Sequence, residues 1–167
     1  MDMYLGGDDF DDAILKFIVS EFKRMEGIDL VEDIRLRKAA EEAKIALSSS
    51  LETEINVPNI TSDLDGRSMD LKIILTRETF ESLVSHFAER ITKFCEKGLK
   101  KAGLTAKDIA DVVLVGGMAN VPLVKRVLTE VFGKSPMGGV VHKEAVALGA
   151  TKADTEGCVG CHFNFNT

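Results

Sequence analysis

The chain has 167 residues, of which 45% are hydrophobic and 29% charged, and it contains only 3 prolines. That length suits one domain with a buried core, and the composition excludes a disordered, collagen-like or disulfide-dense protein. The net charge is −6 and aromatic residues are few, so the sequence offers neither the positive charge nor the stacking side chains that bind nucleic acid. We therefore expect no nucleic-acid partner. No apolar run approaches the roughly 18 residues that span a bilayer, and the first residues have no targeting pattern. We therefore expect a soluble protein with no membrane partner.

Three stretches have the three-and-four spacing of apolar residues that is typical of an amphipathic helix. We expect helices over residues 10–25, over about 29–47 and from a Thr76 cap to just before Gly103. Gly27 is expected to end the first helix and Gly103 the third, because glycine adopts the left-handed conformation common at helix ends.

Four acidic residues gather where the first helix begins. Carboxylates are favourable there because they cap free backbone N–H groups and meet the positive end of the helix dipole. We therefore assign the whole cluster to the helix start, with Asp8 or Asp9 as the cap, and not to a functional site. Its members are Asp8, Asp9, Asp11 and Asp12.

Between the second and third helices the apolar period changes from 3.6 to 2, which predicts two strands over residues 51–57 and 69–75. The connection, residues 58–67, is rich in Pro, Asn, Asp, Ser and Gly and is typical of a turn. We expect an antiparallel hairpin with one face against the helices.

After Gly103 the pattern changes to that of a strand followed by a helix. Residues 105–108 have the form of a capping box, and residues 112–115 predict a strand buried on both faces. A helix is expected over 121–132, then a glycine-rich loop over 133–139 and a short helix near 144–152. The last fifteen residues show no periodicity and are expected to fray.

Gly116 and Gly117 stand between that strand and the following helix. Glycines at a helix N-terminus let backbone N–H groups approach phosphate oxygens, and ligands of open α/β sheets bind beyond strand ends. A tight turn without a ligand explains the same two residues, and spacing alone favours that simpler interpretation.

Glu41, Lys44 and Ser48 lie near one face of the second helix because they are spaced by three and four. Together they could hold a molecule with several hydrogen-bonding edges. The alternative is an ordinary solvated face with one Glu–Lys pair and a serine near the helix end.

Cys158, Cys161 and His162 match the C-x-x-C-H pattern of haem attachment. The motif lies near the chain end with no secretion signal, and a structural zinc site needs four ligands, so we expect neither haem nor metal there. Three cysteines in all suit a reducing compartment. No Ser-His-Asp triad or catalytic carboxylate pair can be assembled from the sequence.

Five segments stand in the order and spacing seen in the ATPase domain of the seventy-kilodalton heat-shock chaperones. The resemblance covers residues 5 to about 151 and is nearest to the bacterial and mitochondrial branch. The segments are LGGDDFD (5–11), EEAKIALSSS (41–50), LTRETFE (75–81), VLVGG (113–117) and EAVALGA (144–150).

The resemblance implies an α/β (α+β) fold, most of the second lobe of an actin-like ATPase. Residues 5–85 are similar to the outer subdomain, with helices and a small antiparallel sheet. Residues 86–152 resemble part of the inner, ribonuclease-H-like subdomain, and residues 153–167 form an irregular tail without resemblance.

The resemblance also implies a shared ATP or ADP site. Family positions that match Glu41, Lys44 and Ser48 hold the adenosine, and Ile45 is expected to pack on the adenine. Three further residues would complete the site, namely Gly116, Gly117 and Asn120.

Two departures from the family pattern fall near this implied site. Ala119-Asn120 replaces a Thr-Arg pair whose arginine would lie against the adenine, so a planar cationic contact is lost. Val141-His142-Lys143 replaces Asn-Pro-Asp and exchanges an acid for a base.

We therefore expect a fragment or truncated relative of these chaperones, which act in protein folding and in the stress response. It would carry the adenosine half of the site and the surface gripped by nucleotide-exchange factors, with J-domain co-chaperones acting through the full-length protein. Magnesium would bind only with the missing lobe, and the chain alone is expected to be inactive as an ATPase. The alternative is a nucleotide-independent interaction module. The resemblance implies the mitochondrial matrix, or a bacterial or organellar cytoplasm.

Overall fold

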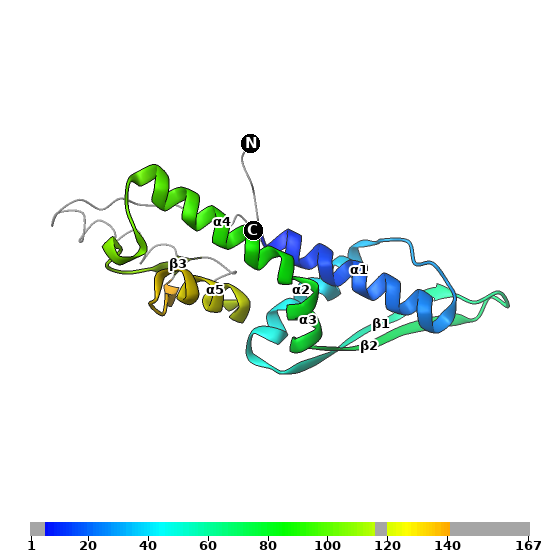
Figure 1. The fold of residues 1–167 in the computed structure, drawn as a ribbon. Helices are drawn as coiled ribbons and strands as arrows, with labels where there is room; N and C mark the ends of the chain where they lie inside the picture. The colour runs from blue at the N-terminus through cyan, green and yellow to red at the C-terminus, as the bar shows by residue number, and fades with distance from the viewer. Residues whose placement is uncertain (1–5, 116–119, 141–167) are drawn as a thin grey trace. The chain divides into compact units, whose positions relative to one another are not determined.

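The computed structural model describes residues 6–115 and 120–140 of the chain (Figure 1). They divide into two compact units, one of Asp8–Ser85 and one that begins at His86 and also takes in Gly6 and Gly7. The sequence assigns residues 5–85 to an outer subdomain and residues 86–152 to an inner one, and that assignment stays a prediction. No helix in the described part of the chain is long and apolar enough to cross a membrane.

Helix α1, Gly7–Glu26, buries one face. Four of its buried side chains recur at steps of four, namely Phe10, Ile14, Ile18 and Phe22, and Asp11 and Leu15 are buried beside them. The helix begins at Gly7, so the prediction that Asp8 or Asp9 caps it is wrong: both lie in the first turn, where they still meet the positive end of the dipole. Gly27 ends the helix as predicted, at φ 70°.

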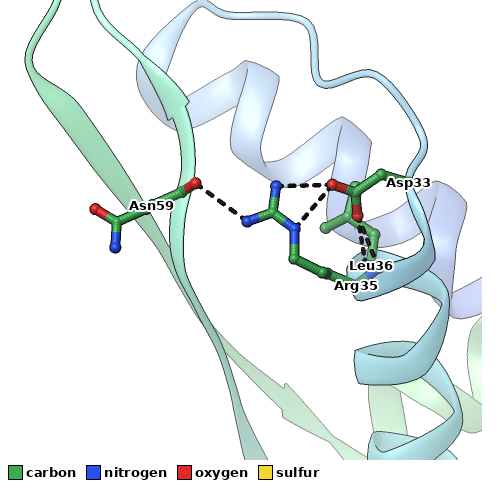
Figure 2. A network of polar contacts seen from close by, with 4 residues as sticks. All are labelled: Asp33, Arg35, Leu36 and Asn59. Atoms are coloured by element: carbon green, nitrogen blue, oxygen red, sulfur yellow. Dashed lines mark hydrogen bonds and ion pairs between the residues drawn. The ribbon is translucent and has the colours of Figure 1, made fainter.

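Helix α2 spans Ile34–Ser49 and begins about five residues later than predicted. The reason is Asp33, whose carboxylate caps the helix by accepting hydrogen bonds from the backbone N–H groups of Arg35 at 2.8 Å and Leu36 at 3.0 Å. The Arg35 guanidinium pairs with the other Asp33 oxygen at 2.8 Å and donates to the Asn59 carbonyl at 3.2 Å (Figure 2). The start of α2 is thereby joined to the hairpin.

Replacing Asp33 with alanine is expected to lower the free energy of unfolding by about 1 kcal/mol, because two N–H groups lose their cap. The Leu36 and Arg35 hydrogen bonds hold the pKa of Asp33 below its ordinary 3.8. This contribution is therefore present above pH 3.8 and is lost as the pH falls through the lower folded-state pKa. Urea unfolding followed by circular dichroism checks both points. The control is Glu32→Ala, since Glu32 only approaches Arg37 at 4.0 Å; an equal loss in both variants would contradict the cap.

Strands β1, Glu52–Ser62, and β2, Ser68–Thr76, pair antiparallel, which confirms the predicted hairpin. Strand β1 packs against α2. The predicted connection was too long, because β1 continues past Pro58 through a register shift between Val57 and Thr61. Asn59 lies in this shift at φ 52°, a conformation that asparagine tolerates better than most residues. The buried hairpin side chains are Ile55, Val57, Ile60, Leu71, Ile73 and Leu75.

The single helix predicted after Thr76 is wrong: the structure has α3, Arg77–Leu83, and α4, Ser85–Ala102. Thr76 does cap α3, accepting from the Thr79 N–H at 3.1 Å. The interruption lies at Val84, with φ −101° and ψ 7°, where the Ser85 hydroxyl donates to the Ser82 carbonyl at 2.9 Å. A serine hydroxyl that donates to a nearby backbone carbonyl competes with the backbone hydrogen bonds of the helix.

Helix α4 ends in a Schellman motif at Gly103, φ 68°. The N–H of Leu104 donates to Leu99 at 3.0 Å and that of Gly103 to Lys100 at 3.2 Å. A 3-10 turn, Ala106–Asp108, follows with its predicted capping box, in which the Thr105 N–H donates to Asp108 Oδ2 at 2.7 Å.

From residue 113 on, the described part of the second unit contains a strand, a helix and a second strand. Strand β3, Val113–Val115, pairs parallel with β4, Met137–Val140, and α5, Pro122–Phe132, lies between them in the chain. Strand β4 was predicted as loop, because its two central glycines hide a strand pattern. Burial of β3 on both faces was also wrong, since Val113 is 44% exposed. The helix predicted near 144–152 and the tail lie outside the described residues.

Candidate functional site

Four of the predicted site residues come from α2. At 3.6 residues per turn, Glu41, Lys44, Ile45 and Ser48 fall within about 100° of arc on this helix. The arc borders the buried stripe of Ala40, Ala43 and Leu47. Glu41 and Ile45 are exposed, with Ile45 at 61%, whereas Lys44 and Ser48 are half-buried. We call these four residues the α2 face.

Lys44 is anchored to the face by a residue of α1. Its ammonium Nζ lies 2.9 Å from Asp11 Oδ2, and only 14% of the Lys44 side chain and 11% of the Asp11 side chain are exposed. The assignment of all four N-terminal carboxylates to the helix start is therefore wrong for Asp11. Asp12 also has another role, since its Oδ1 accepts from Arg37 at 3.1 Å. Sequence alone could not find these pairs, because the partners lie far apart in the chain.

The Asp11 carboxylate has an unusual electrostatic setting. Burial raises its pKa above 3.8, although the hydrogen bond and charge of Lys44 act in the opposite direction. The carboxylates of Glu41 and Asp8 add to the rise. Asp11 Oδ1 is buried and has no hydrogen-bond partner among the described residues. Glu41, Lys44 and Asp11 therefore form one group of interacting charges.

The C-terminal end of α2 is held by its neighbours. The Ser48 hydroxyl donates to the Lys44 carbonyl at 3.3 Å, and the Arg77 guanidinium of α3 donates to the Leu47 carbonyl at 2.9 Å. A cation at this end complements the helix dipole. Arg77 was missed at sequence level as a residue that supports the face.

The simpler interpretation of the face predicted a Glu–Lys pair on the helix itself. Such a pair exists between Lys38 and Glu42 at 3.8 Å, and both side chains are well exposed. Lys44 instead pairs with Asp11 on α1. The α2 face thus combines an anchored ammonium with an exposed carboxylate, a hydroxyl and an exposed aliphatic side chain.

The other predicted site residues are less informative. Gly116 and Gly117 lie outside the described residues, as do Cys158, Cys161 and His162. Asn120 is exposed two residues before the start of α5, in the second unit, so its part in a shared site stays a prediction. Within residues 6–115 and 120–140, no three His, Cys, Asp or Glu side chains gather as a metal site.

Known proteins resemble the chain over most of its length. The family model described as "Hsp70 protein" matches residues 1–154. The mitochondrial heat shock 70 kDa protein of Solanum tuberosum is 55% identical over 153 residues, which are 89% of this chain and 22% of that protein. The mitochondrial heat shock 70 kDa protein of Pisum sativum is 54% identical over the same length, with the same shares. The chain therefore spans about a fifth of the length of these relatives.

Proposed function

Because this chain belongs to the Hsp70 protein family, we propose that its α2 face binds the adenosine part of ATP or ADP. Members of the family bind these nucleotides. The observation that carries the proposal is the anchored ammonium of Lys44 beside Glu41 and Ser48 on one arc of α2. Ribose hydroxyls need both acceptors and donors, and this arc supplies a carboxylate, an ammonium and a hydroxyl.

Each side chain has a role in the proposal that follows from its chemistry. The exposed Glu41 carboxylate accepts hydrogen bonds from ribose hydroxyls, and Lys44 donates to ribose oxygens. Ser48 can donate or accept, because a hydroxyl does both. Ile45, exposed in the free chain, loses water contact when the flat adenine covers it, which favours binding.

The resemblance to the family implies that Gly116, Gly117 and Asn120 would complete the site. Backbone N–H groups at a glycine turn suit phosphate oxygens. Asn120 cannot supply the planar cation that the family's arginine would, so we expect weaker adenine binding than in relatives with that arginine.

Calorimetry with ADP and with adenosine tests the proposal. Wild type is expected to bind both, and Glu41→Gln and Ser48→Ala are each expected to weaken binding about tenfold, the effect of losing one hydrogen bond to a charged or buried partner. The matched control is Glu42→Gln, one position along α2, which pairs only with the exposed Lys38 in the described contacts. Absence of binding by wild type, or equal effects in all three variants, would overturn the proposal. Retained binding to an exchange factor without ADP binding would favour an interaction module.

The activity of the whole relatives is also proposed for the protein to which these residues belong. It would act as an ATP-dependent chaperone of the mitochondrial matrix, served by J-domain co-chaperones and by an exchange factor that grips this lobe. The mitochondrial names of the potato and pea relatives support the compartment. We do not expect the 167 residues by themselves to hydrolyse ATP, because phosphoryl transfer needs metal and charges around the γ-phosphate, which the family places in the other lobe.

A further inference from the structure

The pair between α1 and α2 adds a residue to the site. We propose that Asp11 is a positioning residue for nucleoside binding: its carboxylate fixes the Lys44 ammonium, and Lys44 in turn contacts the ligand. This inference rests on the proposed function of the α2 face. Asp11 itself is too buried to meet a ligand, with 11% of its side chain exposed.

A lysine side chain that is not held in place is flexible, and this flexibility opposes binding. The lysine ammonium lies at the end of a flexible stem of four carbons, and the side chain loses considerable rotamer entropy when it is held in one place. In this chain the ammonium is already held 2.9 Å from Asp11 Oδ2 before any ligand arrives. One of its three N–H donors is directed to Asp11, and a small exposed fraction of the side chain remains accessible. Binding to such a preorganised donor costs less than binding to a free one.

A purely stabilising role for Asp11 is a poor explanation of its surroundings. Asp11 Oδ1 is buried without a hydrogen-bond partner among the described residues. A buried carboxylate with one unsatisfied oxygen costs stability, and buried ion pairs are often replaced by apolar residues without loss. A role in holding the Lys44 ammonium explains why a carboxylate is present here despite that cost.

The nearby Glu41 carboxylate is a second group that can attract the Lys44 ammonium. Its carboxylate is near enough to Asp11 to raise the pKa of that residue. Without Asp11, Glu41 would be the remaining carboxylate of this charge group to attract the ammonium. Lys44 would then be drawn toward the side chain that is proposed to receive ribose hydroxyls.

The test is Asp11→Asn in the full chain, a change that keeps shape but removes charge. ADP affinity is expected to fall about fivefold to tenfold. Unaltered protein is expected to show a slowly exchanging NMR signal from the Lys44 ammonium, and this signal should be lost in the variant. The matched control is Asp12→Asn, the next residue of α1, whose carboxylate pairs with Arg37. It should change neither result. Asp11→Glu, one methylene longer, should displace the ammonium and weaken ADP binding as well.

The outcomes separate this inference from the proposed function. If wild type fails to bind ADP, both are overturned. If Glu41→Gln and Ser48→Ala weaken binding but Asp11→Asn does not, the adenosine site stands and the role of Asp11 is overturned. Should Asp11→Asn fail to fold, a scalar coupling from Lys44 Nζ to the Asp11 carboxyl carbon in unaltered chain still tests the pair, and its absence would overturn the inference.

Discussion

Replacing Lys44 with methionine is expected to lower the free energy of unfolding by about 3–5 kcal/mol, the usual cost of removing one partner of a buried ion pair. Asp11 would then be a buried carboxylate with neither oxygen compensated, since Oδ1 already has no partner among the described residues. Asp11→Asn should cost less. The flexible lysine stem can bring its ammonium to water, whereas the short aspartate cannot reach it.

The pH dependence of this variant distinguishes an ionic cause from lost packing. Burial raises the pKa of Asp11 above 3.8 and Lys44 opposes that rise, so removing Lys44 should raise the pKa further. A raised folded-state pKa gives stability that is present below 3.8 and is lost as the pH rises through the folded-state value. The destabilisation of Lys44→Met should therefore be largest at neutral pH and shrink in acid.

Urea unfolding at neutral and acidic pH measures the effect. A double variant, Asp11→Leu with Lys44→Met, is expected to recover most of the loss, because an apolar pair no longer buries a charge. Lys38→Met, which removes the exposed partner of Glu42, is the control and should change stability by less than about 0.5 kcal/mol. A loss that is independent of pH and persists in the double variant would contradict an ionic role for the pair.

A second large effect is expected from Phe80→Ala. Phe80 is 2% exposed, and its ring centroid lies 6.3 Å from that of the fully buried Phe10. This contact joins α3 to α1 across the core of the first unit. Truncating a buried phenylalanine usually costs about 3–5 kcal/mol, because both its burial and its packing are lost. The Asp8–Ser85 unit should be close to unfolding in this variant.

Amide hydrogen exchange in β1 and β2 reports on this unit alone and avoids assuming that both units unfold together. Protection of the hairpin amides should fall strongly in Phe80→Ala. Ile74→Ala is the control on the same unit, because Ile74 is 64% exposed on the outer face of β2. Equal loss of protection in the two variants would show that Phe80 has no special place in the core.

Periodicity predicted the long elements well because each has one buried face. It could not place the break at Val84, since Phe80, Val84, Phe87 and Ile91 keep helical spacing and are all buried. The start of α2 depended on Asp33, a cap that the apolar stripe does not include. Short β4 has two glycines and depends on its pairing with β3, which is a tertiary effect.

The candidate site was predictable only in part. The spacing of Glu41, Lys44 and Ser48 placed them on one helix face, and the structure agrees. Asp11 was misassigned because a carboxylate near a helix start has an adequate local explanation. Its real partner lies 33 positions away, and only the packing of α1 on α2 brings the two together.

Helix α1 contacts the rest of its unit through residues that lie far apart in the sequence. Asp11 pairs with Lys44, and the Phe10 ring packs near that of Phe80. Strands β1 and β2, by contrast, are joined by a short turn that Asp63 closes by accepting from the N–H of Arg67. Closing a short loop costs less entropy than joining distant segments, so local contacts form first. The hairpin and α2 should therefore assemble early and α1 dock late, and the α2 face would acquire its anchored lysine only in the final step of folding.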